Sequence, residues 1–521
     1  MKSKALVTGL VCLFALLTWG GITAPAAQAK EGVLTIAFDA GDTPGWDIYR
    51  QAILTPDKFV CSFLYNGLVR FKPGDMDPTK FEPDLAEKWE KSHDGLTWTF
   101  HLRKGVQWHR DFGEFTSEDV VYSLTTARDS GWMRMDFTAF KEIKALDKYT
   151  VQIVLSQPIP SLLGTVADYH GGWIQCKAAR EKLGKDYGLN PVGTGPYQFQ
   201  EYIPKQRSVF VANEKYFRGK PKLKKVVVRY MPDLASREMA FRKGEVNVVE
   251  GVREQQWVNK MKDVPDSKVM IFGPGEILFV HFNVTKKPFD DIRVRKAYCY
   301  AVDKKALIDF IGKDVTVPVF SPVPSDYLGA TEKVERYDYD PEKAKKLLAE
   351  AGYAGGLSFE DVVTEQAAYR RPMEALQAQL KKVGIDVKLR VLEHPAFHKL
   401  IRQGSNAATP FNCARFPIAD YILSQFFHST SMIGKPTAAL NFSMYDKVDD
   451  LLDKARVETD PQKQIALWEQ AQQKIMADAV VLPLYVLKFV FARSNSVDFG
   501  YDLKSTLFLA PPIYWNTTVS K

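Results

Sequence analysis

The order of helices and strands constrains the fold of this 521-residue chain more than any other feature. An apolar helical stripe over 373–383 is followed directly by the alternating strand 385–391. Asp460 and Pro461 open another helix, which leads into an apolar strand around 480–491. Helix followed by strand, repeated in both halves, predicts α/β lobes whose sheets are covered by helices.

Local signals place further elements in the first half. Residues 33–38 form a short apolar run suited to a buried strand, and 96–103 alternates between apolar and polar side chains. Thr116 followed by Asp119 predicts a capping pair that opens a helix. Neither an internal repeat nor a low-complexity linker interrupts the chain. We therefore expect the lobes to be joined by strand crossings rather than by a flexible tether.

The first thirty residues have the features of an export signal. Lys2 and Lys4 precede the apolar stretch 5–18, and Ala27-Gln28-Ala29 has the A-x-A form of a cleavage site. The apolar stretch is shorter than the roughly 20 residues that a bilayer crossing needs. The sequence therefore predicts a signal peptide over 1–29 and a mature protein in the periplasm.

Charge and cysteine content exclude several classes of protein. The net charge of +8 is spread along the chain, without the run of like charges typical of a nucleic-acid arm, so no nucleic-acid partner is expected. Cys12 lies inside the signal and lacks the preceding small residue of a lipidation site. The other cysteines are widely separated and form no C-x-x-C, which favours four buried free thiols over a zinc site.

Sequence motifs for catalysis are absent. The chain has no Walker-type phosphate loop, no H-E-x-x-H and no G-x-S-x-G. The glycine-rich segment 193–197 contains Pro196, which favours a turn over a dinucleotide loop. We therefore expect a protein that is not an enzyme and that carries no cofactor.

His394 and His398 are the one candidate metal pair. Four residues apart on a helix, they would share a face, but Pro395 puts His394 at the helix start and weakens that geometry. Two ligands are also too few for a closed site. A surface or capping role is the favoured interpretation, and no metal site is predicted.

Four segments that follow one another along the chain carry a family resemblance. They are FEPDLAEKW (81–89) with DGLTWTFHLRKGV (94–106), VGTGPY (192–197) with 213–221, residues 282–303, and residues 339–353. Together they resemble the family 5 extracytoplasmic solute-binding proteins, which are the oligopeptide, dipeptide and nickel receptors of ABC importers.

The resemblance implies a periplasmic-binding-protein-like α/β fold. Two α/β lobes would surround a ligand cleft and be joined by two crossover segments, with a small α+β domain inserted in the first lobe. Carried over to this sequence, lobe I is 30–66, 190–281 and 492–521, domain II is 67–189, and lobe III is 282–491.

The resemblance also implies the function. The protein would capture a small organic solute, favour the closed form when loaded, and dock as a monomer on ABC permease subunits in the inner membrane. Two other receptors of the same fold stay open as alternatives, one for peptides and one for a metal or metal chelate. A secreted hydrolase is the weakest alternative, since no nucleophile and base pair was found.

A departure from the peptide receptors predicts the ligand contacts. Those members use a Trp-x-x-Asp-like stretch whose carboxylate pairs with the peptide ammonium, but the matching stretch 412–417 carries Arg415. A contact between like charges at 4 Å costs about 4 kcal/mol at an effective dielectric of 20, so the change of sign favours an anionic ligand group. Phe416 and Trp46 would be apolar walls. Alternatively, Arg415 pairs with Asp420 and closes the hinge.

Three further aromatic residues are candidates for the cleft. Tyr169 and Trp173 lie in a glycine-containing stretch near the end of the insertion, and Tyr485 lies near the second crossing. Aromatic clefts suit small-molecule binding. Large aromatic residues are nevertheless more often found in a core, so a core or rim position is favoured for each.

Overall fold

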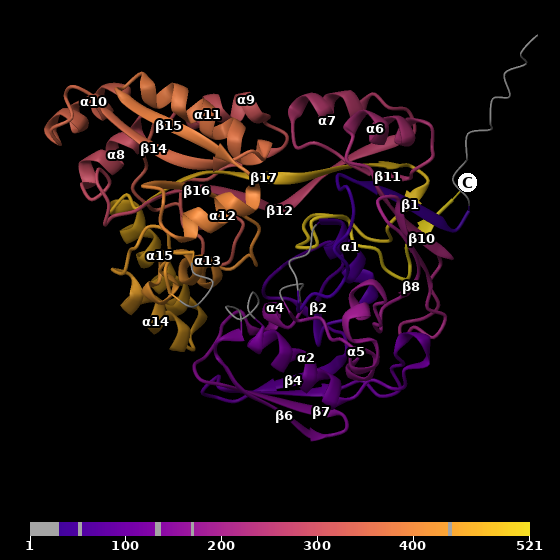
Figure 1. Cartoon of the computed structure of the whole chain (residues 1–521). Helices are drawn as coiled ribbons and strands as arrows, with labels where there is room; N and C mark the ends of the chain where they lie inside the picture. Colours follow the sequence, from indigo (N-terminus) through magenta and orange to yellow (C-terminus); the bar gives the residue numbers. More distant parts are fainter. Residues whose placement is uncertain (1–30, 51–54, 131–136, 168–170, 436–439, 521) are drawn as a thin grey trace, which may run out of the picture.

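A nine-stranded sheet runs through both halves of the molecule (Figure 1). The computed structural model describes residues 31–50, 55–130, 137–167, 171–435 and 440–520, so the predicted signal peptide lies outside the described residues. The strand order is β16 (Ala408–Cys413), β12 (Ser267–Phe282), β17 (Val481–Ser494), β11 (Val248–Glu250), β1 (Val33–Phe38), β10 (Lys225–Tyr230), β9 (Arg207–Ala212) and β8 (Tyr197–Ile203), with β13 (Thr316–Pro318) paired to β17.

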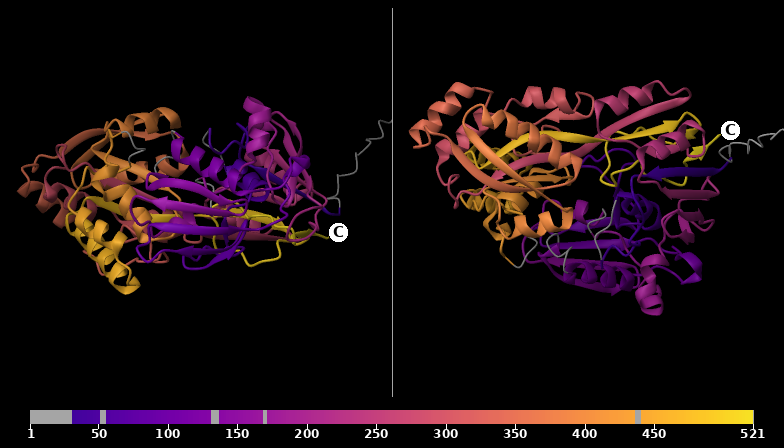
Figure 2. Two further views of the ribbon diagram at one scale, coloured as in Figure 1. Left: turned by 90° about the horizontal axis from the view of Figure 1, so that it is seen from below. Right: turned by 45° about the horizontal axis from the view of Figure 1, so that its top comes forward.

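The long strands β12 and β17 join the two halves. Residues 267–272 of β12 pair with 489–494 of β17, and after an irregularity residues 276–281 pair with 481–487. The right-hand view of Figure 2 shows β17, in yellow, running from one half into the other. The prediction that strand crossings connect the lobes is confirmed. The lobe boundaries at 281 and 491 stay a prediction, and we keep the names lobe I, domain II and lobe III for the predicted ranges.

Lobe I contains parallel strands followed by helices. The predicted strand 33–38 is β1, which pairs in parallel with β10 on one side and β11 on the other. Helix α6 (Leu234–Arg242) follows β10 and is capped by Asp233, and α7 (Gln255–Lys262) follows β11. Helix α1 (Thr55–Leu64) packs its apolar face into the core. The carboxyl ends of β1 and β11 therefore lie side by side, facing lobe III.

Domain II is a separate layered unit below the long strands in Figure 1. Its four-stranded antiparallel sheet has the order β4 (Ala86–Lys91), β5 (Thr97–Leu102), β7 (Thr150–Leu155) and β6 (Phe140–Asp147). The alternating segment 96–103 contains β5, and the predicted capping box opens α2 (Ser117–Asp129). It also contains β2 (Val69–Phe71), β3 (Phe81–Pro83), α4 (Leu162–Thr165) and α5 (Lys177–Leu183).

Lobe III has the helix and strand order that the sequence predicts. The stripe 373–383 lies in α11 (Ala367–Lys381), between the parallel strands β14 (Leu357–Thr364) and β15 (Ile385–Leu392). Asp460 caps α15 (Pro461–Ala477), which leads into β17. The other helices are α8 (Ile292–Tyr300), α9 (Lys304–Ile311), α10 (Pro341–Glu350), α12 (His394–Arg402), α13 (Ala419–Phe427) and α14 (Asp449–Val457).

The four cysteines that the structure describes, Cys61, Cys176, Cys299 and Cys413, are buried and free. Burial raises the pKa of the Cys299 thiol to about 12 and that of the Cys413 thiol to about 11. Thiols with such high pKa values stay protonated at neutral pH, so they act as small apolar side chains in the core.

His281 makes the fold sensitive to acid. It is fully buried on β12 among the rings of Phe279, Phe426, Phe427 and Phe442, and this burial lowers its pKa to about 3. An unfolded histidine has a pKa near 6.5, so below that pH the unfolded chain binds a proton that the folded chain excludes. The free energy of unfolding therefore falls by about 1.4 kcal/mol per pH unit from 6.5 down to 3.

The variant His281→Phe is expected to remove this part of the acid sensitivity. Ser443, whose hydroxyl lies 3.4 Å from the His281 ring, keeps its donation to the carbonyl of Val480 at 2.9 Å. In urea unfolding, the loss of stability between pH 7 and pH 5 should be about 2 kcal/mol smaller than in the wild type. An unchanged loss would show that His281 does not titrate as its burial requires.

Candidate functional site

Two cavities lie between lobe I and lobe III, on opposite faces of β17. Tyr485 and Leu487 line one cavity, while Val486 and Lys488 line the other. This follows from the alternation of side chains along a strand. We call them the Tyr485 cavity and the Lys488 cavity. Both lie where the two crossing strands pass between the lobes.

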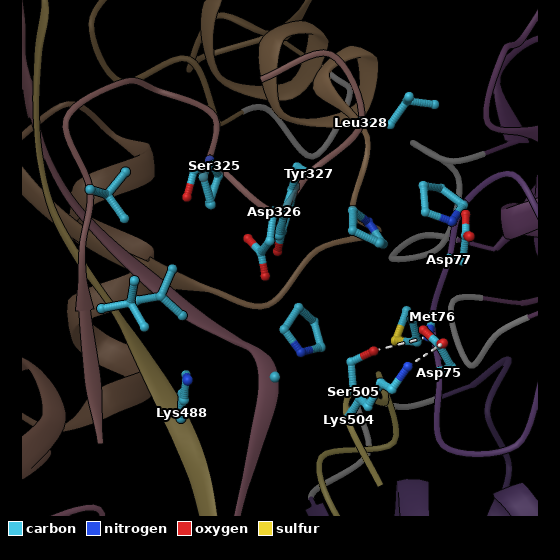
Figure 3. Close-up of a pocket in the computed structure, with 18 of the residues that line it drawn as sticks. Asp75, Met76, Asp77, Ser325, Asp326, Tyr327, Leu328, Lys488, Lys504 and Ser505 are labelled. Atoms are coloured by element: carbon cyan, nitrogen blue, oxygen red, sulfur yellow. Dashed lines mark hydrogen bonds and ion pairs between the residues drawn. The ribbon is translucent and has the colours of Figure 1, made fainter. Parts of the chain in front are cut away.

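The Lys488 cavity is the larger, at about 690 Å³. Figure 3 shows residues 325–328 of lobe III on one side, and 75–77 with Lys504 and Ser505 on the other. The Lys504 ammonium lies 3.5 Å from the Asp75 carboxylate, and the Ser505 hydroxyl accepts from the Met76 N–H at 2.9 Å. These contacts connect domain II to the C-terminal segment and do not extend to lobe III.

The Tyr485 cavity, of about 230 Å³, is built from the carboxyl ends of strands. Asp39 follows β1, residues 250–254 follow or end β11, and Ala367 to Arg371 begin the helix that follows β14. In open α/β sheets, ligands bind outside the carboxyl ends of the strands, where loops from neighbouring units meet. This rule makes the Tyr485 cavity the candidate ligand site.

Two ion pairs surround the Tyr485 cavity. Arg253 of lobe I pairs with Glu276 of β12 at 2.6 Å, and about a quarter of each side chain stays exposed, 26% and 24%. Arg371 of α11 pairs with Glu254, the residue that precedes α7, so this second pair connects lobe III directly to lobe I.

Tyr485, the predicted aromatic candidate near the second crossing, lines this cavity. It is nearly fully buried, and burial together with the nearby Glu276 raises the pKa of its hydroxyl, so the hydroxyl is neutral at pH 7. A neutral phenol on the floor of a charged cavity can donate a hydrogen bond to a ligand and also provide an apolar surface.

Arg415 lies two residues beyond the carboxyl end of β16, and it is not among the residues that line either cavity. Its Nε donates to the side chain of Gln425 at 2.8 Å, and its Nη1 donates to the carbonyl of Ala414 at 2.9 Å. Arg415 and Glu276 act in opposite directions on the pKa of the Cys413 thiol, so both charges lie near the end of β16. The side chain is half-buried, with its guanidinium held in a defined orientation.

Phe416 and Asp420 have structural contacts. The ring centroid of Phe416 lies 5.6 Å from that of Phe71 and 6.3 Å from that of Phe81, so it forms a contact between lobe III and domain II. Asp420 is buried in the first turn of α13 and lies 4.0 Å from the guanidinium of Arg456. These partners differ from the alternative in which Asp420 pairs with Arg415.

Trp46 and Trp173, two of the remaining aromatic candidates, do not line the Tyr485 cavity. Trp46 is fully buried in lobe I, with Phe199 and Phe210 at centroid distances of 5.6 and 5.5 Å. Trp173 is also buried, and its ring lies 5.5 Å from that of Phe508. Both occupy core positions, and we do not carry them into the proposed site. Tyr169 lies outside the described residues.

The two histidines of α12 do share a face. Their Nε2 atoms are 3.0 Å apart, so the expectation that Pro395 weakens this geometry is wrong. Pro395 occupies the first helical turn, where a proline ring causes no clash. Burial lowers the pKa of His398 to about 3. Among the residues that the structure describes, no group of three or more histidine, cysteine or acidic side chains could hold a metal ion.

Six charged residues in or beside this site were missed by the sequence reasoning: Asp39, Glu250, Arg253, Glu254, Glu276 and Arg371. None of them belongs to a motif. One signal was available for Glu250 and Arg253, since the segment VNVVEGVRE places charged residues directly after a short apolar strand. Glu276 and Arg371 come close to that strand end only through the fold.

The fold and the site define a two-lobed binding protein whose lobes close on a ligand. Residues 80–434 match the family described as bacterial extracellular solute-binding proteins, family 5 Middle. The chain belongs to this family, and it functions as a solute-binding protein of an ABC importer. Among the residues described, none of the helices has the length and apolar character that a bilayer crossing needs.

Known proteins with different ligands resemble this chain. The dipeptide-binding protein of Escherichia coli is 32% identical, over 78% of this chain and 81% of its own length. A solved structure of MoaA from A.tumefacien R10 in complex with mannopinic acid is 38% identical, with a TM-score of 0.85, and covers 95% of this chain and 100% of its own. DppA from Helicobacter pylori in complex with the peptide STSA is 28% identical, with a TM-score of 0.81, over 94% and 98% of the two chains.

Proposed function

We propose that this protein captures a small organic anion between its lobes and delivers it, chemically unaltered, to permease subunits in the inner membrane. It would act as a monomer in the periplasm after removal of the signal peptide 1–29. The transporter relatives are binding proteins rather than enzymes, which supports delivery without conversion.

The observation that carries this proposal is the placement of Arg415. Its guanidinium lies at the crossing, oriented by Gln425 and by the carbonyl of Ala414. A preorganised guanidinium can bind a carboxylate through two parallel hydrogen bonds. The family resemblance implies that peptide receptors carry an acid at this position. The likeness to a protein solved with mannopinic acid supports an anionic ligand of that kind.

A peptide ligand is the second candidate. It is favoured by the 32% identity to a dipeptide-binding protein and by the likeness to a protein solved with STSA. A peptide ammonium would have to find its carboxylate elsewhere than at position 415, because arginine repels it there.

A thermal-shift comparison tests the proposal. The probes are mannopinic acid, mannitol as its uncharged polyol counterpart, the peptide Ser-Thr-Ser-Ala, and Ni²⁺ with histidine. A ligand at 100 times its dissociation constant stabilises the folded state by about 2.7 kcal/mol, which such a screen detects. We expect stabilisation by mannopinic acid and none by mannitol. Stabilisation by the peptide or by nickel alone would contradict the proposal.

A further inference from the structure

The lobe I wall of the Tyr485 cavity is acidic. Asp39, Glu250 and Glu254 all line it. Glu254 is neutralised by Arg371, and Arg253 is neutralised by Glu276. Asp39 lies 3.5 Å from the guanidinium of Arg237. Among the described residues, Glu250 is the lining carboxylate that has no ion pair of its own.

Glu250 is held in place by a buried scaffold. The side chain of Arg237 is fully buried, and its Nε donates to the carbonyl of Glu250 at 3.0 Å. The backbone N–H of Asp39 donates to Glu250 Oε2 at 2.9 Å. One carboxylate oxygen is therefore fixed by the end of β1. Within the described part of the chain, the other oxygen, Oε1, accepts no hydrogen bond.

The raised pKa of Glu250 supports a role in binding a positively charged group. Burial raises its pKa to about 7, against the opposing influence of Arg237 and Arg253 and with a further increase from Asp39. Near neutral pH the empty cavity therefore holds this carboxyl about half protonated. A positive charge placed beside it would drive off the proton.

We infer that Glu250 binds a protonated amino group of the ligand, so that the cargo is a zwitterion with its amine on lobe I and its anionic group on lobe III. This inference rests on the proposed function, which supplies the anionic end at Arg415. This arrangement of charges is the reverse of that in the peptide receptors that the sequence resembles. The resemblance implies an acid in those receptors at the position of Arg415.

A zwitterion of this kind would also couple binding to closure. Glu250 belongs to lobe I, whereas Arg415 and Arg371 belong to lobe III. A ligand that carries only one of the two charges can form an ion pair with only one lobe. A ligand with both charges gains its full interaction energy only when the lobes close, which is the condition for a ligand to favour the closed form.

Calorimetric titration with mannopinic acid, a secondary amine that carries carboxylates, tests the inference. Wild type should release about half a proton per ligand at pH 7, measured by comparing phosphate and Tris buffers. Glu250→Gln should bind at least tenfold more weakly and release no proton, and Glu250→Asp should keep proton release. Glu245→Gln is the matched control, because Glu245 pairs with Arg229 at 3.6 Å and does not line the cavity.

The outcomes separate the two proposals. If Glu250→Gln binds like wild type with the same proton release, while Arg415→Ala loses affinity, the amino-group inference is overturned and the proposed function stands. If wild type does not bind mannopinic acid, the proposed function is contradicted and the inference falls with it. Melting temperatures of the variants, compared with that of Glu245→Gln, show whether any loss of binding comes from misfolding.

Discussion

Replacing Arg180 by alanine is expected to destabilise the folded protein by about 3 kcal/mol, because it leaves a buried carboxylate without its partner. Arg180 of α5 pairs with Asp47, and the two side chains are only 4% and 6% exposed. The Arg180 guanidinium also lies 4.8 Å from the centre of the Tyr187 ring. Arg50 lies 3.8 Å from Asp47, but it is exposed and compensates little.

Urea unfolding measures this loss of stability. Two further variants test whether it comes from the unpaired carboxylate of Asp47. In the double variant Arg180→Ala with Asp47→Asn, the buried charge is gone, so about 1–2 kcal/mol should be recovered. Arg229→Ala breaks a partly exposed pair with Glu245 and should cost less than about 1 kcal/mol. A loss of this small size for Arg180→Ala would contradict the assignment of a buried ion pair.

The Arg180 pair matters for function because it joins domain II to lobe I. Asp47 follows β1, while Arg180 belongs to domain II. We expect this pair to keep domain II and lobe I together while lobe III opens and closes about β12 and β17. Hinge motion of this kind, between two bodies around a ligand, is the common mode of closure in binding proteins.

Replacing Arg415 by alanine is expected to weaken the binding of mannopinic acid by about 30- to 150-fold. This corresponds to about 2–3 kcal/mol, the usual contribution of a hydrogen-bonded charge pair in a partly desolvated site. Calorimetric titration gives the affinity directly. The loss should appear mainly in the dissociation rate, because the contact forms after the ligand has entered.

Two arginine variants control the Arg415 measurement. Arg415→Lys keeps the charge but loses the two-pronged geometry, so its affinity should lie between those of wild type and Arg415→Ala. Arg390→Ala removes an exposed arginine of lobe III that pairs with Glu360, and its affinity should equal that of wild type. Equal affinities for Arg415→Ala and Arg390→Ala would remove Arg415 from the site.

Much of the secondary structure could be predicted because it depends on neighbouring residues. The apolar run 33–38 is β1, and the Asp460 cap with Pro461 begins α15. The family resemblance supplied the arrangement of lobes that local patterns cannot give. The 16-residue length of β12 was not predicted, since a strand that serves two lobes has no distinct sequence pattern.

The candidate site was predicted only in part, for physical reasons. Arg415 and Tyr485 lie at the crossing, but Trp46 is a core residue. The sequence could not show this, because an aromatic side chain beside a cleft loop has the same sequence pattern as one that packs inward. Glu250 is positioned by two hydrogen bonds, one from the Arg237 side chain to its carbonyl and one from the backbone N–H of Asp39, after β1, to its carboxylate. The hydrogen bond to the end of β1 joins residues 211 positions apart, which no local pattern records.

Native mass spectrometry of the wild-type protein after incubation with mannopinic acid, mannitol and the peptide Ser-Thr-Ser-Ala tests the central claim most directly. The account predicts a one-to-one complex heavier than the free protein by the mass of intact mannopinic acid, with mannitol and the peptide unbound. A complex with the peptide alone, or a bound or released fragment of the ligand, would contradict it.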